Sequence, residues 1–405
     1  MRTAAVAVIV FLVVVTAVNP GSAGARQPVA GAPVTIPFEL ATRHIIVKVT
    51  VNNSRPLSFV LDTGANTAIV RMATATELGL SLQGSATAGG VGGGAQTGQL
   101  VKDATWSLAG LEGFSQPVAL ALPLPALPAG LGREIDGIIG GEFIKRFVLE
   151  LDYQARTIML HDPRTFAYRG KGETLPLAFT PSGHPVVKAT VTPLGGKPIE
   201  HRFMLDTGSS LALALHSPFV AEHGLLGPQS RTIRATGMGG AGGRSTGRIG
   251  RVAALQVGSF TINNPVTLFS QDTGGSFADR SLAGNIGAQI AGRFRVILDY
   301  GRRRLILERS PAFAEPFDRA FSGIALRADG PNYRTFLVRD VLEDSPAAAA
   351  GIQVGDVITT IDNVAADTLT LTTLSELLEQ PVAHELTIRR GEQTLSVTLT
   401  PARLV

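Results

Sequence analysis

Short apolar and β-branched runs alternate with Gly, Pro, Asn and Asp along most of the chain, a pattern typical of a β-rich body with many turns. Residues 34–40 alternate apolar and polar side chains as an edge strand does. Segments with helical periodicity are few. The best candidates are 72–78 and 218–222, the second with a proline in its expected first turn. We therefore expect an all-β fold for the main body of the chain.

The apolar pattern of this body occurs twice. Four landmarks repeat in the same order, about 144 residues apart: an apolar strand, an Asp-Thr-Gly triplet that ends a second apolar run, a later glycine-containing apolar segment and a Leu-Asp-Tyr triplet. They lie at 46–51, 62–64, 136–144 and 151–153 in the first copy, and at 186–191, 206–208, 283–290 and 298–300 in the second. Solenoid and propeller repeats span only roughly 20 to 50 residues, so this repeat predicts two lobes.

The Asp-Thr-Gly triplets place Asp62 and Asp206 in equivalent turns. An acid that ends a buried strand is costly to ionise unless a second group or water shares its proton or its charge. If the two turns face each other across one cleft, one carboxylate can be charged while its partner is protonated. The pair then supplies a base and an acid for attack by water. Peptide hydrolysis is the leading hypothesis from these residues.

With these landmarks the chain resembles the aspartic peptidases, specifically the retropepsin-like and pepsin-like group, over residues 34–308. The resemblance implies a bilobal pair of β-barrels, which we place at 26–165 and 166–309. It implies that Asp62 and Asp206 form a dyad that binds one nucleophilic water and needs no cofactor. It also implies that the Thr and Gly of each triplet support the carboxylates through hydrogen bonds. These supporting residues are Thr63, Gly64, Thr207 and Gly208.

A glycine-dense stretch follows each triplet, at 89–94 and at 237–243. In the resembled family this position belongs to the flap, a hairpin that closes over substrate. Glycine suits a mobile hairpin tip because it allows unusual backbone angles and adds no bulk. The tyrosine of the pepsin flap is missing from both stretches, and a disordered surface loop is the alternative interpretation. The resemblance assigns the substrate flap to Gly90, Val91, Gly92, Gly93, Gly239 and Gly240.

Two motifs typical of other enzymes occur in the second glycine-dense stretch. Residues 243–247 match the Gly-x-Ser-x-Gly elbow of serine hydrolases, but that elbow must lie between a buried strand and a helix. Residues 237–242 match a dinucleotide-binding glycine pattern, yet no helix can follow through the next glycines. We interpret both matches as parts of the flap.

Several polar residues near the repeats are expected to have structural roles. Asp152 and Asp299 precede a tyrosine and are predicted to fix hairpins, and Asp136 lacks an acidic counterpart in the second copy. Asn285 stands where the first copy has Ile138, and we expect the backbone to satisfy its amide. The seven histidines show no paired ligand spacing, so the sequence predicts no metal site.

The last part of the chain is predicted to be a separate module after a linker at 310–321 that is rich in Pro, Ala and Phe. Residues 344–351 predict a short helix with Ser345 as its N-cap, and 368–379 predict a second, longer helix. A final hairpin is expected over 384–400.

The Ser-Pro-Ala, Ala-Gly-Ile and Gly-Asp motifs of this module resemble the PDZ domains of bacterial envelope proteases. We place this α+β domain at 322–402. A PDZ domain binds a chain terminus by adding it as a strand beside a loop of free backbone N–H groups. The resemblance assigns peptide binding to Gly323, Ile324, Ala325, Leu326, Leu374 and Leu378.

The N-terminus predicts export. Arg2 precedes a continuous apolar stretch at 4–18 and an Ala-x-Ala end at 23–25, which together indicate a signal peptide over 1–25. The stretch is shorter than the roughly 20 residues of a membrane-spanning helix, so an uncleaved anchor is the alternative, and no span is expected after cleavage. The chain has no cysteine, which excludes disulfides and thiol catalysis. We expect a periplasmic or secreted protein.

The composition of the chain argues against a nucleic-acid partner. Of 405 residues 44% are hydrophobic and 17% are charged, with a net charge of +4 and no basic run interleaved with aromatics, so no nucleic-acid partner is expected.

We interpret the chain as an aspartic endopeptidase that acts on polypeptides, with a peptide ligand for its PDZ domain and lobes that pair within one chain. An inactive envelope protein that binds peptides through the PDZ domain is the alternative function, and a homodimer is the alternative assembly.

Overall fold

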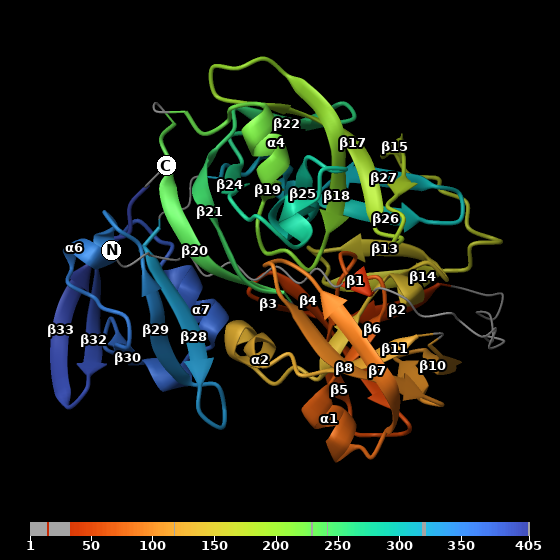
Figure 1. The fold of residues 1–405 in the computed structure, drawn as a ribbon, viewed down its shortest axis with the longest axis horizontal. Coiled ribbons are helices and arrows are strands. Elements are labelled where there is room, and N and C mark those ends of the chain that lie inside the picture. Colours follow the sequence, from red (N-terminus) through yellow and green to blue (C-terminus); the bar gives the residue numbers. More distant parts are fainter. Residues whose placement is uncertain are drawn as a thin grey trace.

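The computed structural model describes residues 14–15 and 33–403, apart from 117, 228–229, 241 and 318–320 (Figure 1). It confirms the expected fold class, with two β-rich lobes and a smaller C-terminal domain beside them. The signal peptide expected at 1–25 lies outside the described residues except for Val14–Val15. Within the described part of the chain, no helix is long and apolar enough to cross a membrane.

The N-terminal lobe is built on a large sheet with the strand order β1-β7-β8-β11-β6-β12-β5-β4-β9-β10, and β3 pairs with β4. Short helices connect its strands. The strands are β1 (Val14–Val15), β3 (Glu39–Ala41), β4 (His44–Val51), β5 (Leu57–Leu61), β6 (Ala68–Arg71), β7 (Ser81–Gly89), β8 (Ala95–Lys102), β9 (Thr105–Leu108), β10 (Leu111–Ser115), β11 (Ala119–Leu122) and β12 (Gly137–Ile139), and the helices are α1 (Met72–Glu77), α2 (Ala126–Leu131) and α3 (Gly141–Ile144).

The C-terminal lobe repeats this plan in a sheet with the order β20-β21-β24-β19-β25-β18-β17-β22-β23, and β16 pairs with β17. Its elements are β16 (Ala178–Phe179), β17 (Pro185–Thr192), β18 (Ile199–Asp206), β19 (Leu213–Leu215), α4 (Ser217–Glu222), β20 (Ile233–Gly240), β21 (Gly243–Arg251), β22 (Ala254–Val257), β23 (Phe260–Asn263), β24 (Val266–Ser270), η1 (Ser276–Ala278), β25 (Gly284–Gly287) and α5 (Ala288–Ala291). Both helices expected after the triplets are present as α1 and α4.

A third sheet joins the two lobes, with the order β15-β27-β26-β13-β14-β2. Its strands are β2 (Val34–Pro37), β13 (Val148–Asp152), β14 (Thr157–His161), β15 (Glu173–Pro176), β26 (Phe294–Asp299) and β27 (Arg304–Arg309). At its centre, β13 of the first copy pairs antiparallel with β26 of the second. Buried side chains from both lobes and from this sheet form one continuous hydrophobic core, so the lobes are packed as one unit.

The C-terminal domain has its own core and a sheet with the order β28-β29-β30-β32-β33, and β31 pairs with β30. Its helix α6 begins after Ser345, whose hydroxyl accepts a hydrogen bond from Ala348 N, as the N-cap prediction requires. The second helix begins later than expected, because Thr370 is its N-cap. The elements are β28 (Ile324–Asp329), β29 (Thr335–Val341), α6 (Pro346–Ala349), β30 (Val357–Ile361), β31 (Val364–Ala365), η3 (Ala366–Thr368), α7 (Leu371–Leu377), β32 (His384–Arg390) and β33 (Gln393–Leu399).

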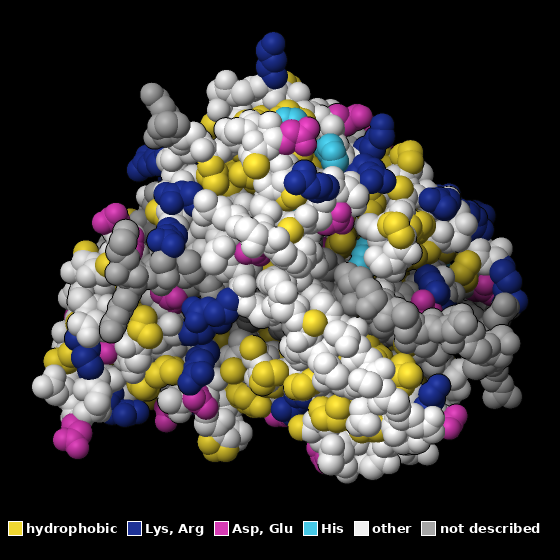
Figure 2. All heavy atoms as spheres, in the orientation of Figure 1, with side chains coloured by type: hydrophobic (Ala, Val, Ile, Leu, Met, Phe, Trp, Pro, Cys, Tyr) yellow, Lys and Arg dark blue, Asp and Glu magenta, His cyan; other side chains and the backbone are white. Residues whose placement is uncertain are grey.

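The segment expected as a linker packs against the C-terminal lobe before it reaches this domain. It contains η2 (Pro311–Ala314), and the carbonyl oxygen of Phe317 accepts a hydrogen bond of 2.9 Å from Arg251 Nη2. On the face drawn in Figure 2, hydrophobic side chains gather around α2, beside the C-terminal domain. Basic and acidic side chains are interspersed on the same face.

Candidate active site

Parallel strand pairs place the two aspartates at matching ends of the lobes. In the N-terminal lobe β12 runs parallel to β5, and Asp62 N donates to the Ile139 carbonyl oxygen at 3.0 Å. In the C-terminal lobe β25 runs parallel to β18, which places Gly287 opposite Asp206. Each Asp-Thr-Gly turn therefore begins at the end of an equivalent parallel strand pair in its own lobe.

The two triplets are held together by their threonines. Thr63 N donates to Thr207 Oγ1 at 3.0 Å, and Thr207 N donates to Thr63 Oγ1 at the same distance. The hydroxyl of Thr63 donates to the Leu205 carbonyl oxygen at 2.7 Å, and that of Thr207 to the Leu61 carbonyl oxygen at 3.0 Å. Both threonines are buried, so these bonds are shielded from water and fix one turn against the other.

The carboxyl groups lie against the glycines of the opposite triplet. A Cβ atom at Gly208 would lie 2.3 Å from Asp62 Oδ1, and one at Gly64 would lie 2.6 Å from Asp206 Oδ1. Gly64 N also donates to Asp62 Oδ1 at 2.7 Å. These close approaches leave no room for a side chain and bring Asp62 and Asp206 together, as the repeat predicted. All six expected dyad and support residues meet at this point.

Burial makes this pair of acids hard to ionise. Neither Asp62 nor Asp206 is exposed to solvent. Burial, and next the negative charge of Asp206, raise the pKa of Asp62 well above its usual range. Burial raises the pKa of Asp206 to about 7, and hydrogen bonds, led by one from Asn285, act in the opposite direction. The two acids titrate as one coupled pair, so a charged and a protonated acid can coexist in the site.

One residue of the site was missed at the sequence level. We expected the backbone to satisfy Asn285, and this was wrong: its Nδ2 donates to Asp206 Oδ2 at 2.8 Å, and its Oδ1 lies 2.9 Å from His216 Nε2. The signal was present, because an Asn replaces the apolar Ile138 of the first copy beside the strand that ends in Asp206.

The glycine-dense stretches form hairpins, which we call the N-terminal flap (β7 and β8) and the C-terminal flap (β20 and β21). Gly90, Val91, Gly92 and Gly93 lie at the tip of the first, and Gly239 and Gly240 lie in the last part of β20. The tips meet, because Gly94 N donates to the Gly242 carbonyl oxygen at 2.8 Å. Val91 is fully buried at this contact.

The competing motifs have structural explanations. Ser245 is buried in β21, where its hydroxyl donates to Asp272, so it has the wrong setting for a hydrolase nucleophile. Asp136 accepts from Ser58 N at 2.8 Å and from Thr74 Oγ1 at 3.0 Å. Within the described residues, no group of three or more His, Asp or Glu side chains is arranged to hold a metal ion.

The repeated Asp-Tyr pairs lie beneath the dyad. Asp152 and Asp299 each accept backbone hydrogen bonds in the following turn, as predicted. Burial raises the pKa of both Tyr153 and Tyr300. The charge of Asp206 also raises the pKa of Tyr153, and that of Asp62 raises the pKa of Tyr300, so each tyrosine lies within electrostatic reach of the acid of the opposite lobe.

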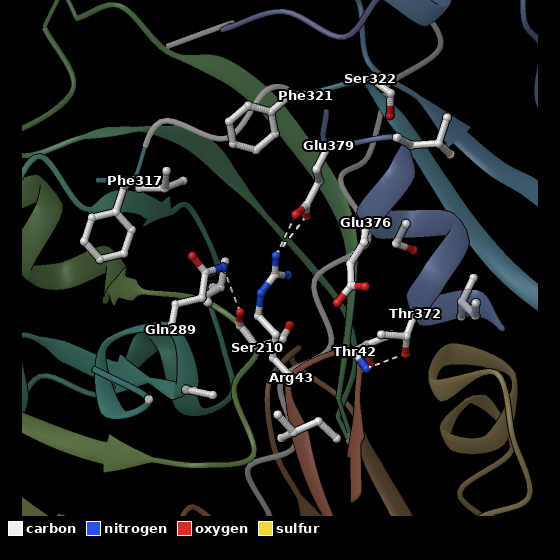
Figure 3. A pocket seen from close by; sticks show the side chains of 18 of the residues that line it. Thr42, Arg43, Ser210, Gln289, Phe317, Phe321, Ser322, Thr372, Glu376 and Glu379 are labelled. Atoms are coloured by element: carbon white, nitrogen blue, oxygen red, sulfur yellow. Dashed lines mark hydrogen bonds and ion pairs between the residues drawn. The ribbon is translucent and has the colours of Figure 1, made fainter. Parts of the chain in front are cut away.

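A cavity of about 390 Å³ lies between the C-terminal domain and the lobes (Figure 3). Four residues expected to bind a peptide line it, namely Gly323, Ile324, Leu326 and Leu378. Ala325 and Leu374 are fully buried and do not line the cavity, and Leu374 belongs to the hydrophobic core of the domain. Leu371 and Ser375 of α7 also line the cavity and were not predicted.

The same cavity is bordered by contacts that hold the domain to the N-terminal lobe. Arg43 forms an ion pair of 2.8 Å with Glu379, and Thr42 N donates to Thr372 Oγ1 at 3.0 Å (Figure 3). Helix α2 packs against β28, the edge strand of the domain. The lobe therefore covers part of the edge where an added strand would pair.

Comparison with protein families agrees with this geometry. The aspartyl protease family model matches residues 47–143 and again 187–290, and a PDZ domain model matches 337–390. The chain carries two aspartyl protease domains and a C-terminal PDZ domain. Each match to the protease model contains one Asp-Thr-Gly triplet and the parallel strand pair that positions it.

Solved structures include similar proteins for both parts. The PDZ domain of HtrA3, bound to a phage-derived ligand, is 26% identical over 20% of this chain and 84% of its own length, with a TM-score of 0.19. Basic 7S globulin from soybean is 13% identical over 70% of this chain and 96% of its own length, with a TM-score of 0.41. The comparison with curated proteins gives no match.

Proposed function

We propose that this aspartyl protease is an exported endopeptidase that hydrolyses peptide bonds through a water shared by Asp62 and Asp206. The observation that carries the proposal is the reciprocal pairing of Thr63 with Thr207, which presses each carboxyl group against the opposite glycine. A structural pair of acids would gain nothing from such burial, because two buried carboxyls without a cationic partner destabilise a fold. The arrangement is explained by a reaction that needs both acids.

The hydrogen bond that Asn285 donates to Asp206 supports an assignment of roles to the two acids. Asp206, which accepts this bond, is the ionised base and takes a proton from the water as its oxygen attacks the carbonyl carbon of the substrate. Asp62 is the acid and gives its proton to the carbonyl oxygen, which yields a neutral gem-diol. The C–N bond then breaks as the leaving nitrogen takes up a proton from Asp206 and a diol hydroxyl returns one to Asp62. The products are a carboxylic acid and an amine, and the dyad regains its first state.

We place the substrate between the dyad and the two flaps. Their meeting glycines carry no side chains, so both tips can follow an extended backbone. Opening must break the bond between Gly94 N and the Gly242 carbonyl oxygen. A polypeptide with an extended segment is the substrate class that this geometry favours.

The PDZ domain is proposed to bind the C-terminus of a polypeptide. The solved HtrA3 domain is described with a peptide ligand. In this chain, the backbone of Gly323, Ile324, Ala325 and Leu326 would receive the terminal carboxylate, and Leu378 would contact an apolar last side chain. Leu374 would support the groove from the core of the domain.

Cleavage of a diverse peptide mixture, followed by mass spectrometry with and without pepstatin, tests the proposal. We expect internal cleavage by the native chain, loss of cleavage with pepstatin, and loss in Asp62→Asn and in Asp206→Asn, both of which keep the fold. Retained activity in either variant contradicts the shared water. A folded native chain that binds peptides but cleaves none over acidic to alkaline pH supports the peptide-binding alternative. Gel filtration with light scattering distinguishes the proposed monomer from a homodimer.

A further inference from the structure

Asn285 connects the dyad to a buried histidine. It lies in β25, between Asp206 at the end of β18 and His216 at the start of α4. The amide donates to Asp206 Oδ2 at 2.8 Å and lies 2.9 Å from His216 Nε2 through its oxygen. None of the three side chains is exposed. These three buried, hydrogen-bonded side chains form a series that starts at Asp206.

The direction of these hydrogen bonds follows from the chemistry of the groups. An ionised carboxylate only accepts hydrogen bonds, so the NH₂ group of Asn285 must face Asp206. The amide oxygen then faces His216, which must carry its proton on Nε2 to donate. His216 therefore determines which end of the amide reaches the acid.

The groups around His216 act on its protonation in opposite directions. The ring packs against Phe277, with ring centroids 5.5 Å apart, and its Nδ1 lies 3.2 Å from the carbonyl oxygen of Asp279. Burial lowers the pKa of His216, and the nearby His201 acts in the same direction, whereas Asn285 and Asp279 oppose them. A neutral ring with its proton on Nε2 makes the contact with Asn285 but has no proton on Nδ1 for Asp279, and only the doubly protonated ring donates to both. Nε2 donates to the amide oxygen in both forms.

The N-terminal lobe lacks this chain. Its counterpart of Asn285 is Ile138, a fully buried apolar residue that pairs with Val60 and Ile69. A hydrogen bond to an ionised acceptor is roughly twice as strong as one between neutral groups. Asp62 accepts a backbone hydrogen bond from Gly64, but only Asp206 receives one from a side chain at this position, so this side-chain donor favours charge on one acid of the dyad.

We propose that Asn285 is a positioning residue, oriented by His216, that fixes Asp206 as the ionised, water-activating member of the dyad. This inference rests on the proposed endopeptidase function. It assigns Asp62 as the acid by default, because Ile138 offers it no donor. The asymmetry is a property of two residues outside the Asp-Thr-Gly triplets.

Asn285→Leu tests the inference by making the C-terminal lobe resemble the N-terminal one at this position. We expect the acid limb of the kcat/KM profile to move to higher pH by about one unit or more, because a hydrogen bond to a charged group is lost. At a pH below the native limb, kcat falls by about tenfold or more while KM changes little. Ile138→Leu is the matched control and should leave the limb in place. An unchanged limb in a folded Asn285→Leu variant overturns the inference.

His216 gives a second pair of variants in case the first does not fold. His216→Leu removes the donor and should shift the same limb, whereas His216→Gln keeps an N–H for the amide oxygen and should restore most of the native profile. A purely structural role would lower the thermal midpoint in both without separating their pH profiles. Equal profiles for the two variants contradict the proposed orientation of Asn285.

A measurement without turnover separates this inference from the proposed function. In an Asp62→Asn background, the carboxyl carbon of Asp206 can be titrated by NMR, and its signal is identified by its absence after Asp206→Asn. Adding Asn285→Leu should raise the pKa of Asp206, even if the native chain cleaves no peptide. If that pKa does not move, the inference is wrong whatever the native activity.

Discussion

Thr63 and Thr207 exchange backbone-to-hydroxyl hydrogen bonds of 3.0 Å across the boundary between the lobes. Each hydroxyl therefore acts once as acceptor and once as donor, the second time toward a carbonyl oxygen of the other lobe. Because the two residues hold the aspartate-bearing turns against each other, the stability of the fold and the proposed catalysis depend on the same four bonds.

Replacement of Thr207 by Val should reduce both the stability of the fold and the rate of peptide cleavage. The change keeps the shape but leaves Thr63 N and the Leu61 carbonyl oxygen without partners, which costs about 1–3 kcal/mol for each buried group. Urea unfolding and peptide cleavage measure the two effects. Thr207→Ser retains the hydroxyl and is the control. Native stability in the Val variant would show that the reciprocal bonds contribute little.

Gly208→Ala should abolish most activity by displacing an acid. Its new Cβ atom would lie 2.3 Å from Asp62 Oδ1, so the carboxyl group must move. A displacement of about 1 Å can reduce the rate by about 100-fold. Steady-state cleavage assays measure the loss, and Gly227→Ala, where nothing lies within 4 Å, should retain native rates. Comparable activity of the two variants would contradict the close approach.

Activity should be greatest from near neutral to alkaline pH. In the proposed mechanism Asp206 is ionised and Asp62 is protonated. Since the pKa of Asp206 is about 7, a fall in pH below that value protonates the base and activity declines. Burial and the charge of Asp206 raise the pKa of Asp62 well above its usual range, and a rise in pH through that pKa removes the acid, so activity declines again. The pH profile of kcat/KM measures both limbs, and an optimum in strong acid would contradict this assignment.

Weakening the contact between the PDZ domain and the N-terminal lobe should increase peptide binding. A strand added to β28 would compete with α2, and the ion pair of Arg43 with Glu379 helps to hold the PDZ domain against the lobe that carries α2. Partly exposed ion pairs contribute about 0–1 kcal/mol, so Arg43→Ala should tighten binding by about two- to fivefold. Fluorescence anisotropy with a labelled peptide that has a free C-terminal Val measures the change.

The control for this experiment is Lys188→Ala, which removes an exposed ion pair with Glu200 far along the chain from the PDZ domain. It should not alter peptide affinity. If Arg43→Ala binds no better than the native chain, or weaker, α2 does not compete for the edge of β28.

Local chemistry made the dyad predictable from the sequence. Asp62 and Asp206 stand in turns whose neighbours repeat in order, and the pairing of equivalent turns follows from the duplication itself. The N-cap at Ser345 was equally predictable, because capping involves residues only three positions apart. These features depend on short-range patterns or on their repetition.

Long-range contacts were not predictable in this way. His216 and Asn285 are 69 positions apart, and no periodicity links a histidine before a helix with an amide in a strand. Ala325 and Leu374 were assigned to a peptide groove from family resemblance, and both side chains are fully buried, Leu374 in the domain core and Ala325 beside a register shift in β28. The contact of α2 with β28 depends on how two domains dock, which local sequence does not encode.

The pairing of β13 with β26 has an evolutionary consequence. Two identical separate subunits could build the same central sheet and the same facing turns, but in such an ancestor every substitution would occur twice. Fusion of the two genes removes that constraint, so one half can acquire an amide while the other keeps a hydrocarbon at the equivalent place. Only after such a fusion can one sequence encode different roles for the two halves, one as proton donor and the other as proton acceptor.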